Sequence, residues 1–193
     1  MLTKKHEMAR ALFKEFAEKE VKPLAQELDE EERFPYETVE KMAKCGMMGI
    51  PVPKQYGGQG ADVLTYIMAV EEMAKVCGTT AVVLSAHTSL CVAPILENGT
   101  EEQKMKWLPE LCAGTKIGGL AVTEPGGGTD INGTKTTAEL VDGQWVINGR
   151  KCFITNAPNA QFFVVFAKKG ALSHGHHGKT GLLFDAGHDI GLI

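Results

Sequence analysis

The residues best suited to chemistry lie in the stretch LAVTEPGGGTD, residues 120–130. Apolar residues typical of a strand run into a threonine, a glutamate and a proline, and three consecutive glycines follow before Thr129 and Asp130. Glycine lets the backbone approach a ligand closely because it has no side chain. Two interpretations are open: a wide turn between strands, or a cradle for a ligand that contacts the main chain.

Two familiar glycine motifs do not fit this stretch. A Rossmann fingerprint requires G-x-G-x-x-G at the start of a helix, whereas strands are predicted to follow here. A P-loop requires Gly-Lys-Ser/Thr, which these residues do not contain. The remaining arrangement is a strand end that offers N–H and C=O groups to a planar heterocycle, with glycines beside a diphosphate or thioester. Thr123 and Thr129 add hydroxyl groups at the two ends of that surface.

A second stretch, KCFITNA at residues 151–157, repeats the theme at another predicted strand end. Phe153 can cover one face of an isoalloxazine ring, and Thr155 can hydrogen-bond to its edge. Taken alone, these two residues are better explained as a core phenylalanine and a solvated threonine.

The elements before residue 117 have helical apolar spacing. The stretch 8–21 carries one stripe, which is formed by Met8, Leu12, Phe13, Phe16 and Ala17. Further helices are predicted over 36–45, ended by Gly46, over 63–77, ended by Gly78, and over 80–98, which is apolar almost all round. Thr100 and Gln103 form a capping box for the next helix, and the Pro- and Gly-rich residues 49–60 form a loop.

After residue 117 the apolar period becomes two. Asp142-Gly143 predicts a two-residue hairpin between residues 136–141 and 145–149, and further strands are predicted at 162–168 and 180–185. The fold class is therefore α+β: a helical domain over residues 1–117 and an antiparallel, barrel-like β domain over residues 118–193. The chain stops in the apolar run DIGLI, so we expect it to be cut from a longer protein.

The composition excludes some classes of function. A net charge of −4 leaves no basic surplus to neutralise a phosphate backbone, so nucleic acid is not an expected partner. Five scattered cysteines without a C-x-x-C pair predict reduced thiols and a cytoplasmic protein. The apolar-rich run at residues 81–96 is predicted to be a buried helix, because it is too short and too polar for a membrane span.

The two chemical segments together resemble the acyl-CoA dehydrogenase family. The resemblance is carried by AVTEPGGGTD, then two hairpin turns, then NGRKCFITNA. It extends to YGGQGAD, AVEEMAK, SAHTSLCVAPI and NGTEEQKMKWLPELCAGTKIG in the helical half, and thus to essentially the whole chain. Within the family, the likeness is strongest to the short-chain, butyryl-CoA-like members.

The resemblance implies an FAD-dependent oxidoreductase of fatty acid metabolism. Members have an N-terminal helical domain, a middle β domain and a C-terminal four-helix domain, and this chain would lack the last. They remove two hydrogens across Cα–Cβ of an acyl-CoA substrate, pass electrons to electron-transfer flavoprotein, and are usually homotetramers. Their catalytic base is a glutamate of the C-terminal domain, so we expect no catalytic base here and no activity from this chain alone. Because some adenosine contacts of the family come from that domain and from a neighbouring subunit, we also expect this chain to bind FAD only weakly.

The resemblance also assigns binding residues by position. The first FAD segment comprises Leu120, Ala121, Val122, Thr123, Glu124, Pro125, Gly126, Gly127, Gly128 and Thr129. The second comprises Phe153, Ile154 and Thr155. Thr129 stands where the family has a serine that also contacts the substrate, and Phe153 where it often has tryptophan. Glu124 is expected to be structural.

Other candidates are weaker. His174, His176 and His177 are expected to lie in a solvated loop, and no metal site is predicted. His87 is expected to be a core histidine, although the resemblance allows it or Leu90 to shape acyl-chain length. Phe13, Phe16 and Leu24 are each expected to be ordinary core residues, although the resemblance allows them to be exposed contacts for electron-transfer flavoprotein. Two alternative functions remain open: an acyl-CoA oxidase, and a noncatalytic module that docks a flavoprotein.

Overall fold

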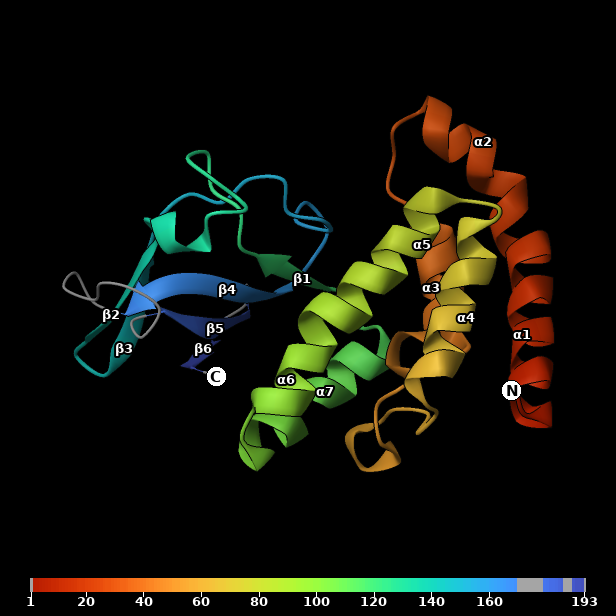
Figure 1. Cartoon of the computed structure of the whole chain (residues 1–193), viewed down its shortest axis with the longest axis horizontal. Coiled ribbons are helices and arrows are strands. Elements are labelled where there is room, and N and C mark those ends of the chain that lie inside the picture. The colour runs from red at the N-terminus through yellow and green to blue at the C-terminus, as the bar shows by residue number, and fades with distance from the viewer. Residues whose placement is uncertain (1, 170–178, 186–188, 193) are drawn as a thin grey trace.

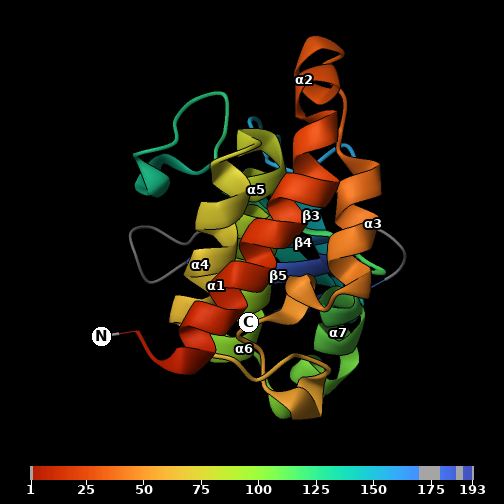
Figure 2. The same cartoon turned by 90° about the vertical axis from the view of Figure 1, so that its right-hand side faces the viewer.

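The structure is a computed structural model that describes residues 2–169, 179–185 and 189–192. A block of helices and a β-sheet lie side by side (Figure 1), so the helix-then-sheet architecture predicted from the sequence is confirmed. Seen from the helical side, α1 crosses in front of the other helices and the sheet lies behind them (Figure 2).

The N-terminal helix is longer than its apolar stripe suggests. Helix α1 (Lys4–Phe16) begins at a capping box of Thr3 and His6, and continues through the π-helical segment η1 (Ala17–Val21) into α2 (Lys22–Glu30). Ala17 is buried, but Met8 and Leu12 are 61% and 64% exposed. Met8 and Leu12 thus lie on the outer face of the helix, and the stripe predicted from the sequence is buried only in part.

A glycine was predicted to end each of the next two helices, and this prediction is confirmed for only one of them. Helix α3 (Tyr36–Lys44) is followed by Gly46 at φ 70°, as expected of a glycine stop. Helix α4 (Val63–Ala74) ends before Gly78, which does not stop it. Gly78 instead opens α5 (Gly78–Ser85), because the Cys77 thiol caps this helix by accepting the Thr80 N–H.

Helix α5 continues through the π-helical segment η4 (Ala86–Val92) into α6 (Ala93–Asn98). Among the described residues, this one 21-residue helix is long and apolar enough to cross a membrane. The expectation that the run is too short and too polar for a span therefore fails on length and composition. The buried-helix prediction fits better, because 56% of that window is buried inside the protein.

The last helix leads into the sheet. Helix α7 (Glu101–Ala113) begins at the predicted capping box of Thr100 and Gln103 and ends at Gly114, φ 70°. Strand β1 (Gly118–Ala121) follows after a short connection. The loop predicted over residues 49–60 is present, with short 3-10 turns η2 (Met47–Gly49) and η3 (Lys54–Tyr56).

The sheet is mixed, which corrects the prediction of an antiparallel domain. Its other strands are β2 (Thr137–Val141), β3 (Gln144–Asn148), β4 (Phe162–Lys169), β5 (Lys179–Asp185) and β6 (Asp189–Leu192). The order is β3-β2-β4-β5-β6, and β1 and β2 both run parallel to β4 along one of its edges. Long connections after β1 and β3 allow these parallel pairs, because parallel strands cannot be joined by a tight turn. The β2–β3 hairpin turns at Asp142 and Gly143, as predicted.

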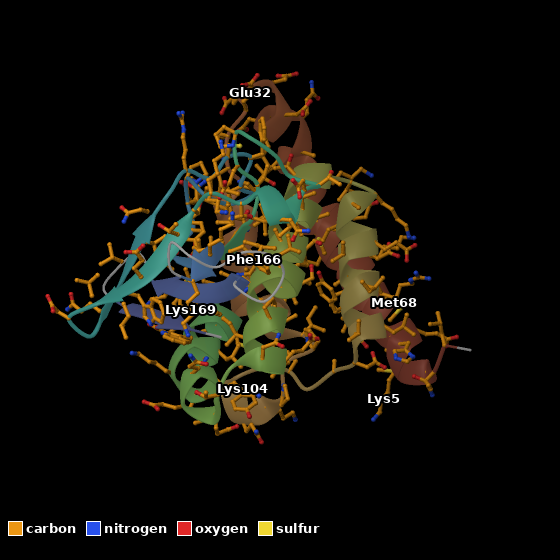
Figure 3. The ribbon with its side chains drawn as sticks, turned by 60° about the vertical axis from the view of Figure 1, so that its left-hand side comes forward. Lys5, Glu32, Met68, Lys104, Phe166 and Lys169 are labelled. Atoms are coloured by element: carbon orange, nitrogen blue, oxygen red, sulfur yellow. The ribbon has the colours of Figure 1, made fainter. Side chains whose placement is uncertain are left out.

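The helical block and the sheet share a hydrophobic core. Trp107 of α7 packs against Phe162 of β4 with ring centroids 5.5 Å apart. Phe166, four residues further along β4, also packs on the hydrophobic cluster that contains Trp107 and Phe162. Lys169 lies at the end of the strand (Figure 3). Strand β4 is thus the surface on which the helices fix the sheet.

Candidate functional site

The first predicted segment leaves the sheet at the end of β1, as the sequence suggested. After Ala121 the chain passes Val122 and Thr123, both half-buried, and enters a tight turn. Glu124 and Gly127 exchange two backbone hydrogen bonds of 3.0 Å across this turn. Residues 125–130 are exposed.

Two of the three glycines of this turn, Gly126 and Gly127, are not required by packing within the folded chain. None of Gly126, Gly127 and Gly128 has a left-handed backbone. A Cβ on Gly126 would meet no atom of the described chain within 4 Å, and one on Gly127 would lie 3.8 Å from its nearest neighbour. A Cβ on Gly128 would lie 3.3 Å from Thr123 Cγ2. Space is therefore kept open over the backbone of residues 126 and 127, as a close ligand would require.

The second predicted segment is not a strand end, which corrects the sequence-based interpretation. In this fully described part of the chain, no strand lies between Asn148 and Phe162. Phe153 has φ 56° and is 93% exposed, so it is neither a strand residue nor a core phenylalanine. Ile154 packs on the small cluster that includes Ala121. A left-handed non-glycine residue is strained, and such strain gathers at functional sites.

The structure brings the two segments together. The Cys152 N–H donates to the Thr123 carbonyl at 3.0 Å, and Lys151 Nζ donates to the Val122 carbonyl at 2.9 Å. A Cβ on Gly119 would lie 3.0 Å from the Thr155 carbonyl oxygen, so that the second segment also crosses closely over β1. The two predicted segments therefore lie side by side, with the exposed Phe153 in the second of them.

A buried carboxylate holds the two segments together. Glu124 is 8% exposed and accepts hydrogen bonds from the backbone N–H groups of Lys135 (2.7 Å) and Thr136 (2.9 Å), from the Thr136 hydroxyl, and from Lys151 Nζ at 2.9 Å. Burial raises the pKa of Glu124, but the hydrogen bonds from Lys151 and Thr136 outweigh it and bring the pKa to about 2. The carboxylate is thus ionised and fully engaged within the protein.

Lys151 was not singled out by the sequence analysis. The available signal was Glu124 itself, since a carboxylate at the end of a buried strand requires a cationic or hydrogen-bonding partner. Which cation supplies it depends on the path of a loop 27 residues further on, and this is not visible in the local pattern.

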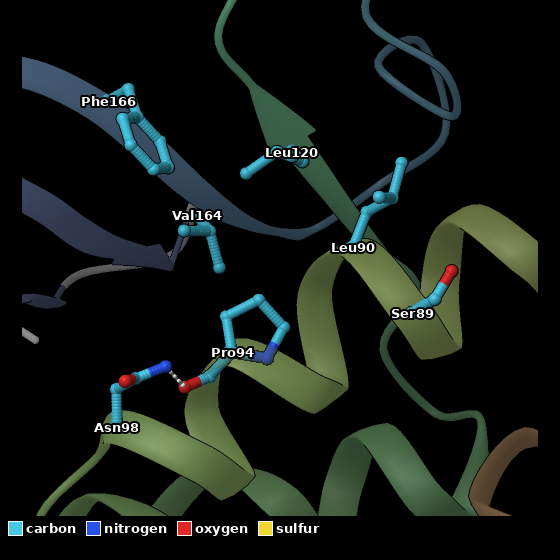
Figure 4. Close-up of a pocket in the computed structure, with 7 residues that line it drawn as sticks. All are labelled: Ser89, Leu90, Pro94, Asn98, Leu120, Val164 and Phe166. Carbon is cyan, nitrogen blue, oxygen red and sulfur yellow. Dashed lines mark hydrogen bonds between the residues drawn. The ribbon is translucent and has the colours of Figure 1, made fainter. Parts of the chain in front are cut away.

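An apolar cavity adjoins the first segment. Its volume is about 480 Å³, and it lies between the helix Gly78–Asn98 and the sheet (Figure 4). The lining residues are Ser89, Leu90, Pro94, Asn98, Leu120, Val164 and Phe166. Leu120 belongs both to this lining and to β1, so the cavity begins where the first segment does.

Of the two residues considered for acyl-chain length, Leu90 lines this cavity. His87 is fully buried in the helix instead. Its Nε2 lies 3.1 Å from the Leu111 carbonyl, and its Nδ1 accepts the Gly118 N–H at 3.0 Å. Burial lowers the pKa of His87 to about 4, so the ring is neutral.

Comparison with known proteins identifies the chain's relatives. Residues 3–115 match the family model of the acyl-CoA dehydrogenase N-terminal domain, and residues 119–192 match that of the middle domain. The chain belongs to the acyl-CoA dehydrogenase family. It is 58% identical, over 166 residues, to the short-chain-specific acyl-CoA dehydrogenase of Clostridium acetobutylicum, covering 86% of this chain and 44% of that protein.

Solved structures are also similar to this chain, and they support its assignment to the acyl-CoA dehydrogenase family. Butyryl-CoA dehydrogenase of Megasphaera elsdenii is 40% identical with a TM-score of 0.91, covering 97% of this chain and 50% of that one. A chain described under the electron transferring flavoprotein of Acidaminococcus fermentans is 42% identical with a TM-score of 0.93, over 97% and 49%. An acyl-CoA dehydrogenase of Bacillus anthracis complexed with FAD is 33% identical, with a TM-score of 0.87, over 96% and 32%. The chain spans about half the length of the first relatives that it matches.

The structure places Phe13, Phe16 and Leu24 at the helical core, as the core-packing expectation had it, and not at an exposed docking surface. Phe13, Phe16 and Leu24 are partly buried and pack against the helical core. The exposed apolar residues of α1 are Met8 and Leu12, one helical turn apart. The apolar spacing in the sequence could not distinguish the half-buried residues from the exposed ones, because both kinds recur at three- and four-residue intervals along the same continuous helix.

The histidines considered for a metal lie outside the described residues. These are His174, His176 and His177. Within residues 2–169, 179–185 and 189–192, no group of three or more His, Cys, Asp or Glu side chains could hold a metal ion.

Proposed function

We propose that this chain provides the flavin- and substrate-binding part of an FAD-dependent acyl-CoA dehydrogenase of the short-chain type. The parent enzyme removes two hydrogens across Cα–Cβ of an acyl-CoA thioester. One observation carries the proposal: the hydrogen bond from Cys152 to Thr123, which joins the two segments into one surface beside an apolar cavity. The similarity to short-chain and butyryl-CoA dehydrogenases supports the substrate class.

The residues of this surface fit FAD. Val122 and Thr123 offer backbone and hydroxyl groups to the edge of the ring, Thr155 offers a second hydroxyl, and Phe153 has an uncovered aromatic face. The open backbone at residues 126 and 127 suits a diphosphate. Bound FAD supplies the acceptor for the hydride that leaves Cβ. The remaining cofactor-binding residues, from Leu120 to Thr129 and at Ile154, shape this surface.

The cavity suits the acyl part of the substrate. Leu90, Leu120 and Phe166 give it apolar walls, which exclude water from a short acyl chain. Thr129 is exposed at the far end of the first segment, and its hydroxyl would contact the thioester arm. Cavity and segment meet at Leu120, so an acyl chain in the cavity lies beside the flavin surface.

Glu124, in the proposed flavin segment, does not fit the role of catalytic base of the parent enzyme. Glu124, the carboxylate of the flavin segment, is held by Lys151 and Thr136 and is not free to take a proton. We therefore propose that the catalytic base comes from a C-terminal helical domain and that residues 1–193 alone bind without turnover. The proposal includes a domain boundary between residues 117 and 118, a homotetrameric parent and a cytoplasmic location.

The proposed electron acceptor is electron-transfer flavoprotein. The similarity to a chain described under such a flavoprotein supports this choice over oxygen. On this chain, the exposed pair Met8 and Leu12 of α1 is the proposed contact.

FAD binding to the 193-residue chain tests the proposal. We expect FAD to bind, with quenching of flavin fluorescence, and Gly126→Val to raise Kd at least about tenfold by filling the space that a ligand needs. Gly78→Val is the matched control, because a Cβ at Gly78 also meets no described atom within 4 Å and lies far along the chain in α5. The proposal is wrong if millimolar FAD leaves the flavin spectrum unchanged, or if both variants bind alike.

A further inference from the structure

Both backbone groups of Gly118, the first residue of β1, are bound by side chains from distant parts of the protein. The N–H donates to His87 Nδ1 at 3.0 Å. The carbonyl accepts from Asn156 Nδ2 at 3.1 Å. Gly118 is buried. Removing His87 would therefore leave its N–H, and removing Asn156 would leave its carbonyl, without a partner and without access to water.

His87 ties β1 to two helices. The ring is fully buried in the helix Gly78–Asn98, and it accepts from Gly118 at Nδ1. The proton of the neutral ring is therefore on Nε2, which donates to the Leu111 carbonyl in the last turn of α7. One imidazole thus fixes the end of α7 and the start of β1, the two ends of the connection between helices and sheet.

Asn156 ties the same point to the second segment. It follows Phe153 and Thr155 in the loop, is 7% exposed, and has φ 68°, a conformation that asparagine tolerates. Its Nδ2 also lies 3.4 Å from the Val83 carbonyl of α5. The loop is thereby held against both β1 and the helix that carries His87.

Strand β1 packs tightly against the helix Gly78–Asn98 at Gly118. A Cβ at Gly118 would lie 2.4 Å from Cys91 Sγ, so the strand lies directly on the helix. Because the backbone of β1 is in contact with the helix, small shifts of His87 or Asn156 pass to the strand and to Thr123, five residues further on.

We infer that His87 and Asn156 are positioning residues that set β1 and the loop 151–157 against each other, so that Thr123 and Thr155 face one ligand. This inference rests on the proposed flavin site. Neither residue belongs to the binding surface; both act through Gly118. The Cys152 N–H, bonded to the Thr123 carbonyl, reports whether the two segments stay together.

The test compares His87→Leu and Asn156→Gly with matched controls in the 193-residue chain. Leu84→Ala is the control for His87, because Leu84 is buried in the same helix and belongs to the helical core. Ala157→Gly is the control for Asn156, since it adds the same backbone freedom at an exposed site in the same loop. Asn156→Gly keeps the left-handed backbone and remains informative if His87→Leu does not fold.

Two measurements are made on each variant. Hydrogen exchange of the Cys152 amide without ligand is expected to rise at least about tenfold over the matched control, because the junction opens locally. The Kd for FAD is expected to rise at least about fivefold over the same control. His87→Asn, whose Oδ1 replaces Nδ1 as acceptor, is expected to return both values to within about threefold of wild type.

The outcomes separate this inference from the proposed function. If the wild-type chain does not bind FAD, the proposed function fails, whatever the exchange rates are. If wild type binds FAD but both variants exchange and bind like their controls, the positioning role is wrong and the function stands. An Asn variant no better than the Leu variant at position 87 also overturns the positioning role.

Discussion

Glu124 is a charged residue at the end of a buried strand, and its partners come from two later parts of the chain. Thr136 and the backbone at Lys135 reach it from the start of β2, and Lys151 reaches it from the loop after β3. A buried carboxylate with these donors organises three backbone segments at once. Within the proposed flavin-binding segment, Glu124 is thus a structural residue, with no proton to take or give at neutral pH.

Replacing Lys151 by Met is predicted to destabilise the chain by about 3 kcal/mol at neutral pH, because the Glu124 charge is left buried without its cation. The folded pKa of Glu124, about 2, lies below its usual 4.5, so this stabilisation is complete above pH 4.5 and is lost as the pH falls toward 2. Urea unfolding of wild type and variant across this range measures both effects. The difference between the two proteins shrinks as the pH is lowered.

Lys135→Met is the control for this prediction. Lys135 contributes its backbone N–H to Glu124, and its side chain is exposed, so the substitution leaves that hydrogen bond in place. A loss of stability as large as that of Lys151→Met, or a constant difference down to pH 2, would contradict the assigned role of Lys151.

At the scale of elements, strand β1 owes its position to close contact with a helix. Gly118 touches Cys91, and Gly119 lies under the Thr155 carbonyl, so two consecutive glycines let β1 fit between the helix and the second segment. The glycines at 126 and 127 differ in kind, since the protein leaves the space above them open. This part of the chain therefore contains glycines required by packing and glycines above which the protein leaves open space.

Gly118→Ala is predicted to destabilise the chain by roughly 1–3 kcal/mol, because the new methyl group overlaps Cys91 and forces the strand or helix to move. Gly126→Ala is predicted to change stability by less than about 0.5 kcal/mol, because its Cβ meets open space. Thermal or urea unfolding of the two variants measures this contrast. Equal losses of stability in the two variants would contradict the distinction between a glycine required by packing at 118 and a glycine in open space at 126.

At the scale of the whole molecule, the helical block has two faces with different tasks. The helix Gly78–Asn98 and α7 hold the sheet through His87, Trp107 and the cavity wall. Helix α1 lies on the outer side of the block (Figure 2) and exposes Met8 and Leu12 there. We propose that substrate and cofactor bind at the inner face and that a partner protein contacts the outer face.

Replacing Met8 and Leu12 together by Glu is predicted to weaken binding of the chain to electron-transfer flavoprotein at least about fivefold, because both apolar contacts become charged. FAD affinity is expected to stay unchanged, since α1 lies away from the sheet. Met105→Glu is the control, as Met105 is 53% exposed on α7. Partner binding measured by titration decides the point, and equal affinities for all three proteins would exclude α1 as the contact.

Sequence alone determined the features whose causes are local. The capping box at Thr100, the glycine stop at residue 46 and the Asp142-Gly143 hairpin each depend on residues a few positions apart. The two segments proposed to bind a ligand also stood out by residue type. These features follow from backbone preferences and short-range hydrogen bonds, which the sequence carries directly.

Only the tertiary structure decided how distant segments meet. The parallel pairing of β1 with β4, the Lys151–Glu124 contact and the binding of Gly118 by His87 and Asn156 each join residues far apart in the chain. Exposure on α1 was decided in the same way, by which face of the helix packs on the other helices. Such pairings depend on the packing of the complete core, so no short stretch of sequence contains them.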